Sequence, residues 1–202
     1  RLPEAKALAE ALCRAQPQDA EAWQLLGVIQ GSLGEIQAAE ICLRKAIELH
    51  PELAVAHYNL ASLLEARGHL EEAAQGYRAM LRLNPDHALA RQRLATLLTR
   101  QGQYAEAEGE HREVVRLKPH DADAHYNLAN TLYHLGKVAE AEASYRTALQ
   151  AKPGFAEVYN NLGVAYHKRD LVENAEQAFA KALSLDPAFY LAQSNLADIY
   201  IS

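Results

Sequence analysis

Cysteine and long apolar runs are scarce in this sequence. Its 202 residues include two cysteines, Cys13 and Cys42, and both fall within helical apolar patterns. We expect two buried, reduced thiols that behave as small hydrophobic side chains, and no disulfide between them. This pattern favours a reducing compartment and predicts a cytoplasmic location. No stretch approaches the roughly 20 consecutive apolar residues of a membrane span, so we expect no membrane partner.

Motifs of catalysis and cofactor binding are also missing. The sequence has no glycine-rich phosphate loop, no nucleophile elbow and no cysteine–histidine metal spacing. His134 and His167 fall on neighbouring predicted helices, but a metal site needs three or four convergent ligands. We therefore expect no catalytic residue, no metal and no cofactor, in a chain that is not itself an enzyme.

A surplus of positive charge is absent as well. The chain has 20 Lys and Arg residues against 26 Asp and Glu residues, for a formal net charge of -6. Proteins that bind nucleic acid carry a basic face or stripe. The charge balance therefore predicts no nucleic-acid partner.

What the sequence does contain is a repeat with a period of 34 residues. Proline recurs at this interval, at Pro17, Pro51, Pro85, Pro119, Pro153 and Pro187. A leucine followed by a small residue recurs in the same register, as Leu26-Gly27, Leu60-Ala61, Leu94-Ala95, Leu128-Ala129, Leu162-Gly163 and Leu196-Ala197. Two helices joined by a short turn approach closely only at small residues, so the pattern predicts stacked helix pairs.

This pattern resembles the tetratricopeptide repeat, a helix-turn-helix unit of the same period. The residues that carry the resemblance are Trp23, Leu26 and Gly27 in one copy and Tyr166, Ala175, Phe179 and Pro187 in a later one. The resemblance covers essentially the whole chain. It implies an all-α, right-handed superhelical solenoid of antiparallel helix pairs, with the first helix of each pair lining a concave groove.

The register divides residues 1–202, predicted to be a single solenoid domain, into five full repeats and two partial ones. The full repeats are 20–53, 54–87, 88–121, 122–155 and 156–189. Residues 1–19 correspond to the second helix of a truncated repeat, and residues 190–202 to the first helix of another. Because both ends stop within a repeat, we expect a fragment of a longer protein whose exposed terminal helices could self-associate.

Several local features follow from the same register. Asp19 is expected to cap the first full repeat, and Gly34, Gly68, Gly102 and Gly136 are expected to turn between paired helices. Asp170 takes the place of glycine in the last repeat and should tolerate the same left-handed turn. Large residues should fill the space between pairs at Leu43, Tyr77, His111, Tyr145 and Phe179. Glutamates on the second helices are expected to form a solvated face: Glu71, Glu72, Glu106, Glu108, Glu140 and Glu142.

A ladder of asparagines occupies the sixth position of the first helices. Its members are Asn59, Asn127, Asn161 and Asn195, and the series is interrupted by Leu25 and Arg93. A carboxamide both donates and accepts hydrogen bonds, so it can hold the backbone of an extended peptide without reading its side chains. A hydrogen bond between helices of the protein itself is the alternative use of these amides.

The ladder resembles that of the repeat domain of O-linked N-acetylglucosamine transferases and their relatives. In that family, ladder asparagines bind the backbone of protein substrates and lead them toward a glycosyltransferase domain. The resemblance implies that the four ladder asparagines are peptide-binding residues. It also implies a possible parent enzyme in which this chain is the substrate-recruiting arm.

Arginines and tyrosines complete the predicted groove. Arg93 and Arg100 are candidates to bind one acidic group of a ligand, or else are simply solvated. Tyr58, Tyr126 and Tyr133 are candidates to stack on a peptide and donate a hydrogen bond. Tyr104, Tyr145 and Phe155 are expected to pack between helices.

The sequence thus predicts a protein–protein interaction module that binds a protein or peptide ligand in a concave groove. Two alternatives remain at this point: a recruiting arm of a larger enzyme such as a glycosyltransferase, and a self-assembling scaffold.

Overall fold

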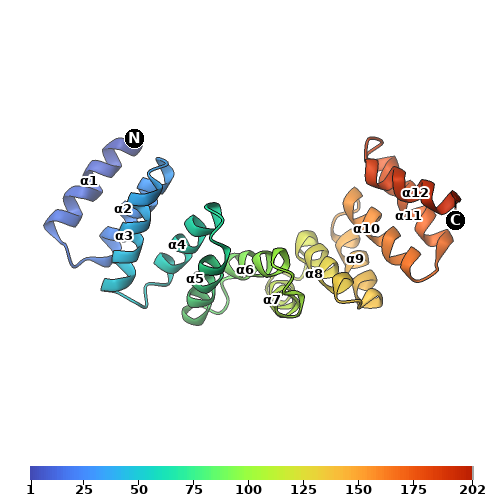
Figure 1. Ribbon diagram of the computed structural model, residues 1–202, viewed down its shortest axis with the longest axis horizontal. Helices are drawn as coiled ribbons and strands as arrows, with labels where there is room; N and C mark the ends of the chain where they lie inside the picture. The colour runs from blue at the N-terminus through green and yellow to red at the C-terminus, as the bar shows by residue number, and fades with distance from the viewer. Residues whose placement is uncertain (202) are drawn as a thin grey trace. The chain divides into compact units, whose positions relative to one another are not determined.

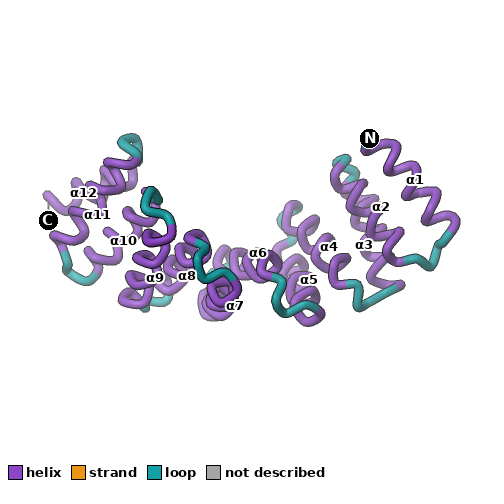
Figure 2. Tube along the Cα trace, turned by 180° about the vertical axis from the view of Figure 1, so that it is seen from behind, coloured by secondary structure: helices purple, strands orange, loops and turns teal. Residues whose placement is uncertain are grey.

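The computed structural model describes residues 1–201 and contains twelve helices joined by short turns, with no strand in that range (Figures 1 and 2). Ser202, the last residue of the predicted final helix, lies outside the described residues. Within residues 2–83 and 104–201, each helix packs against the next along the chain. The fold is an all-α solenoid of helix pairs, as the sequence predicts. The right-handed superhelix stays a prediction.

Contacts divide the chain into two units, Arg1–Leu97 and Leu98–Ser202, called unit 1 and unit 2 below. Unit 1 contains α1 (Leu2–Ala15), α2 (Ala20–Ser32), α3 (Ile36–Leu49), α4 (Ala54–Ala66), α5 (Leu70–Leu83) and most of α6 (Ala88–Arg100). Unit 2 contains the end of α6, α7 (Tyr104–Leu117), α8 (Ala122–His134), α9 (Val138–Ala151), α10 (Ala156–Lys168), α11 (Val172–Leu185) and α12 (Tyr190–Ile201). Even-numbered helices are called leading helices and odd-numbered ones second helices.

Small residues set the close approach within each pair. A Cβ added at Gly27 in α2 would lie 2.8 Å from Cγ of Leu43 in α3. In unit 2, a Cβ at Gly163 in α10 would lie 2.6 Å from the ring of Phe179 in α11. The small residues that recur in the sequence therefore lie where a leading helix touches its second helix. The large side chain of the second helix packs against them there.

Turns between the paired helices use the left-handed backbone region. Gly34, Gly68, Gly102 and Gly136 have φ between 74 and 80°, and Asp170, in the same place of the last pair, has a φ of 61°. Both predictions about these turns are confirmed. Glycine adopts this conformation without steric cost, and aspartate is among the residues that tolerate it.

In five of the six leading helices, a side chain three residues into the helix binds the carbonyl oxygen of the proline in the preceding connection. Trp23 Nε1 donates to the carbonyl oxygen of Pro17 at 3.0 Å. The equivalent residues of later repeats do the same: His57 to Pro51, Arg91 to Pro85, His125 to Pro119 and Gln193 to Pro187, at 2.7–2.9 Å. Asp19, as predicted, accepts hydrogen bonds from the amides of Glu21 and Ala22.

The core lies between the helix pairs, where the large residues of the predicted series are buried. Tyr77, Tyr145, Phe179 and Leu43 are at most 2% exposed, and so is His111 in α7. Cys13 and Cys42 are buried free thiols, and burial raises the pKa of Cys42 to about 11. Both thiols therefore remain protonated near neutral pH.

Candidate functional site

A cavity of about 380 Å³ opens on the leading helices of unit 2. It is lined by Thr99, Asn130, Tyr133, His134, Tyr145, Asn161 and Val164. Five of these residues belong to the leading helices α8 and α10. Thr99 comes from the end of α6, and Tyr145 reaches the cavity from α9. The lining combines aromatic rings with two carboxamides, a composition typical of sites that orient a ligand through a few polar groups.

A hydrogen-bonded network forms one wall of this cavity. The hydroxyl of Tyr145 donates to Oδ1 of Asn130 at 2.6 Å, and Nδ2 of Asn161 donates to the same oxygen at 2.9 Å. Nδ2 of Asn161 also donates to the hydroxyl of Tyr126 at 3.3 Å. Burial raises the pKa of Tyr145, so its hydroxyl stays protonated and acts as a donor. The network thereby holds Asn130 and Asn161 in fixed orientations.

The predicted ladder divides into two kinds of asparagine. Asn161 and Asn195 each donate to the fifth residue of the preceding leading helix, Tyr126 in one case and the buried Asn160, at 2.9 Å, in the other. Asn59 and Asn127 are half-buried, and among residues 1–201 their side chains have no hydrogen-bond partner. Asn161 and Asn195 therefore link successive helix pairs, while Asn59 and Asn127 keep their carboxamides available for a ligand.

The three predicted groove tyrosines have different surroundings. Tyr133 lines the cavity, and Nζ of Lys168 lies 5.1 Å from the centroid of its ring. Tyr126 is half-buried and packs 5.2 Å from Phe155, centroid to centroid, while its hydroxyl accepts from Asn161. Tyr58, in unit 1, contacts the rings of Tyr77 and His87.

The two predicted arginines also differ. In unit 1, Nη1 of Arg93 lies 3.6 Å from a carboxylate oxygen of Glu65, so this cation already has an acidic neighbour. Arg100 is exposed at the end of α6 and pairs with no acidic side chain among the described residues. Asn59 lines a second cavity of about 320 Å³ between α2, α3 and α4, together with Val28 and Ser62. The structure therefore places the predicted residues around more than one cavity.

Two of the glutamates predicted to form a solvated face are buried, and that prediction is wrong for them. Glu108 and Glu142 are 8% and 3% exposed, whereas the other four are exposed. Glu142 pairs with Arg146 one turn along α9 and with Arg169 at the end of α10. Its carboxylate faces the end of the next leading helix rather than solvent, because the second helix packs there on the following repeat.

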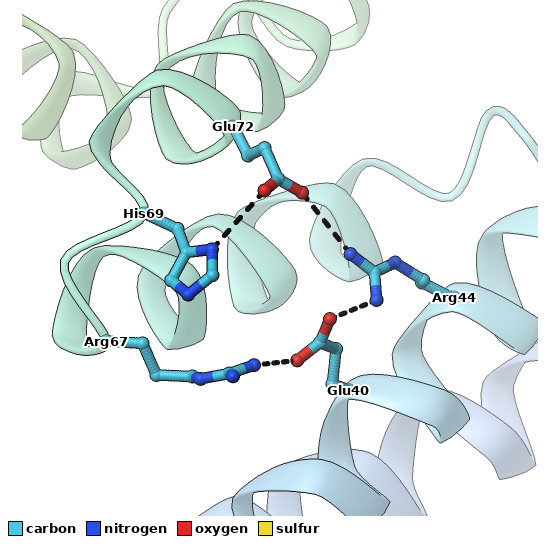
Figure 3. A network of polar contacts seen from close by, with 5 residues as sticks. All are labelled: Glu40, Arg44, Arg67, His69 and Glu72. Atoms are coloured by element: carbon cyan, nitrogen blue, oxygen red, sulfur yellow. Dashed lines mark hydrogen bonds and ion pairs between the residues drawn. The ribbon is translucent and has the colours of Figure 1, made fainter.

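The same arrangement of polar contacts occurs in unit 1 around Glu40 (Figure 3). Glu40 is also buried. Its carboxylate pairs with Arg44 in α3 and with Arg67 at the end of α4, and Arg44 continues to Glu72, which contacts His69. Each arginine is partly exposed, so the network sits at the surface edge of the interface between repeats. Its geometry is that of a brace between repeats.

Sequence reasoning missed Asn130 and Asn160, which complete the network around the cavity. Asn130 follows Asn127 by three residues, so the two share a helix face. Asn160 directly precedes a ladder asparagine and donates to its Oδ1 at 3.1 Å. The spacing of these asparagines could have predicted that they lie near the ladder. The side chain that accepts each hydrogen bond depends on the preceding repeat and could not be predicted in the same way.

Neither a metal cluster nor a membrane-spanning segment is found in the described part of the chain. Residues 1–201 contain no group of three or more His, Cys, Asp or Glu side chains placed to hold a metal ion. None of the helices in this range has the length and apolar character that crossing a membrane requires.

The paired helices, the small-residue contacts and the repeated proline connections define an α-solenoid repeat protein. Models of the tetratricopeptide repeat match residues 20–53, 42–75, 66–110, 93–154 and 135–189. Together these matches cover residues 20–189 without a gap. The chain belongs to the tetratricopeptide repeat family.

Solved structures share this fold. YrrB, described as a TPR protein with an unusual peptide-binding site, aligns with a TM-score of 0.87 at 23% identity, covering 92% of this chain and 96% of YrrB. MamA from Desulfovibrio magneticus RS-1 aligns with a TM-score of 0.76 at 20% identity, covering 85% and 97%. TTC0263 from Thermus thermophilus aligns with a TM-score of 0.58 at 23% identity, covering 91% and 100%. Among curated proteins, no sequence matches significantly.

Proposed function

We propose that this chain is a non-catalytic binding module that holds an extended peptide segment against the leading helices of unit 2. Fold and family support the general class, a protein–protein interaction module. The observation that carries the peptide-binding proposal is the cavity lined by Asn130, Tyr133 and Asn161. It presents carboxamides and aromatic rings together on the leading helices, where an extended backbone can reach both.

Asn127 is the main backbone-binding residue in this proposal. Its carboxamide lies one helical turn from Asn130 and has no partner within residues 1–201, so it can donate to a peptide carbonyl and accept from a peptide amide. Asn161 contributes less, because both hydrogens of its amide group are used within the protein. Asn59 has a similarly available carboxamide in unit 1 and would extend binding there.

The likeness to YrrB supports the proposal at the level of the fold. That protein is described as having a peptide-binding site, and its chain aligns with this one over almost all of its length. With 23% identity, the residues that bind peptide are not carried over. The assignment of Asn127 rests on its free carboxamide in this chain.

A binding experiment on the purified chain tests the proposal. Peptides selected from a phage-displayed library of random ten-residue sequences are labelled with fluorescein, and their affinity is measured by fluorescence anisotropy. Asn127→Ala should weaken binding by about tenfold, the effect expected for loss of one to two hydrogen bonds to a desolvated backbone. Glu140→Gln, on the exposed face of α9, is the matched control and should leave affinity unchanged. Equal affinity of wild type and Asn127→Ala would remove the ladder from the mechanism.

Self-assembly is a second candidate, because large apolar side chains are exposed on both terminal helices. Leu8 in α1 is 73% exposed, and Tyr190 and Ile201 in α12 are 78% and 84% exposed. Sedimentation velocity measured over about two orders of magnitude in protein concentration would reveal reversible association by mass action. Constant sedimentation over that range would exclude it. The recruiting arm of a glycosyltransferase stays a prediction from the ladder.

A further inference from the structure

The cavity of unit 2 has features of an anchor for one particular kind of side chain. We propose that it receives an aromatic side chain of the bound peptide, and that the residues flanking this aromatic side chain are acidic. The inference rests on the proposed peptide-binding function and adds to it the chemistry of the ligand.

The walls of the cavity favour a flat, large side chain. Its aromatic lining consists of Tyr133, His134 and Tyr145, and Val164 adds an apolar contact from α10. The ring of His134 is itself stacked on Tyr104, with centroids 4.6 Å apart, so its orientation is fixed. The volume of about 380 Å³ lies at the small end of ligand pockets, which run from roughly 300 to 1,000 Å³. One aromatic side chain suits this space, and offset or edge contacts with the lining rings would stabilise it.

A hydrogen-bond donor is available beside these rings. Oδ1 of Asn130 already accepts from Tyr145 and from Asn161, which uses both of its lone pairs. The amide nitrogen of Asn130 has no partner among the described residues, although the side chain lines the cavity. Asn130 can therefore only donate to a ligand, and a tyrosine hydroxyl or a carbonyl next to the anchor would accept.

An exposed cation beside the cavity supports acidic flanking residues. Lys168 is exposed and lies over the ring of Tyr133, a lining residue. Lys168 pairs with no carboxylate within residues 1–201. The chain as a whole has a net charge of -6, and the carboxylates that are buried in it already have cationic partners. A carboxylate on the ligand would give Lys168 the partner that the protein does not supply.

Selection from the phage-displayed library of random ten-residue peptides tests the anchor. We expect the enriched peptides to carry Phe, Tyr or Trp next to Asp or Glu, and replacing that aromatic residue with alanine in a synthetic copy should weaken binding by about tenfold or more. In the variant Val164→Trp, whose added ring occupies the cavity, the same replacement should change affinity by less than about twofold. Far-ultraviolet circular dichroism confirms that this variant is folded.

A charge variant tests the rim and does not depend on repacking the cavity. Lys168→Glu changes an exposed side chain, so it should fold normally, and it should remove or reverse the preference for acidic residues while keeping the aromatic preference. Arg82→Glu, an exposed cation in unit 1, is the matched control and should leave both preferences intact.

Each other outcome is decisive. Enriched peptides without an aromatic residue beside an acidic one would overturn the anchor and leave peptide binding intact. An aromatic preference that survives Val164→Trp, or an acidic preference that survives Lys168→Glu, would overturn its placement in this cavity. Failure to enrich any peptide would overturn the proposed function and the anchor together.

Discussion

His111 makes the stability of unit 2 depend on pH in a way that can be calculated. It lies in α7 in the register of Tyr77 and Tyr145, is 2% exposed, and its Nδ1 has no hydrogen-bond partner among residues 1–201. Burial lowers its pKa from 6.5 to about 4, because the charged imidazolium loses its hydration there. The folded protein therefore binds fewer protons than the unfolded chain between these two values.

The sign and size of the effect follow from this difference. The contribution of His111 to the free energy of unfolding is fully present above pH 6.5. It decreases as the pH falls toward 4, where the folded state begins to bind the proton as well. One pKa unit corresponds to about 1.4 kcal/mol, so unit 2 should lose about 2–3 kcal/mol from this residue between pH 7.5 and pH 4.5.

Replacing the imidazole removes its titration and shows how much His111 contributes to the pH dependence of the free energy of unfolding. His111→Leu places at this position the residue that Leu43 provides in the first full repeat, where it is also 2% exposed. Urea unfolding followed by circular dichroism at pH 7.5, 6.0 and 4.5 should show the wild type losing about 2–3 kcal/mol more than the variant. His120→Gln, at an exposed histidine of the same unit, is the control and should follow the wild-type curve.

Parallel pH curves for wild type and His111→Leu would show that His111 does not cause the loss of stability in acid. An NMR titration in which His111 protonates near pH 6.5 in the folded protein would show the same, since the loss requires a lowered pKa. Fluorescence of the single tryptophan, Trp23, reports on unit 1 and shows separately whether acid affects the other unit.

Three further predictions concern side chains whose surroundings differ within a matched class. Asn161→Ala should lower the free energy of unfolding by about 1–3 kcal/mol because it removes a hydrogen bond to Asn130, whereas Asn127→Ala should change it by less than about 0.5 kcal/mol. Thermal and urea unfolding measure both. Gly163→Ala should cost about 1–3 kcal/mol through overlap with a ring in α11, whereas Gly109→Ala, with no atom near its added Cβ, should stabilise α7 by about 0.5–1 kcal/mol. Glu142→Gln should cost about 1–3 kcal/mol at pH 7, and a loss near zero at that pH would contradict its role as a brace.

The periodic features of the fold could be predicted because each depends on one residue type at one backbone position. A glycine or aspartate is needed where φ is positive, as at Gly136 and Asp170, and a small residue is needed where two helices touch, as at Gly163. These requirements recur in every repeat with the same geometry. A single sequence with five copies therefore contains enough signal to place them.

The side chains that connect repeats were harder to predict, because each depends on residues about 30 positions away. Glu142 is as charged as Glu140, yet it is buried because Arg169 at the end of the next leading helix meets its carboxylate. A glutamate is expected to be exposed from its residue type alone, and a cationic partner such as Arg169 is what allows it to be buried. The cavity was missed for a similar reason, since its lining comes from four different helices.

The same principle separates binding residues from structural ones within the ladder. Two ladder asparagines are structural because the fifth residue of the preceding leading helix accepts from their amide: Tyr126 accepts from Asn161, and Asn160 accepts from Asn195. Before Asn59, the fifth position holds Gln24, whose carboxamide also has an oxygen, but no hydrogen bond joins the two side chains. Asparagines that recur in the sequence at one position of the repeat are therefore compatible with a binding surface confined to part of the array. Selection for backbone binding would act on Asn127, while selection for stability would act on its neighbours.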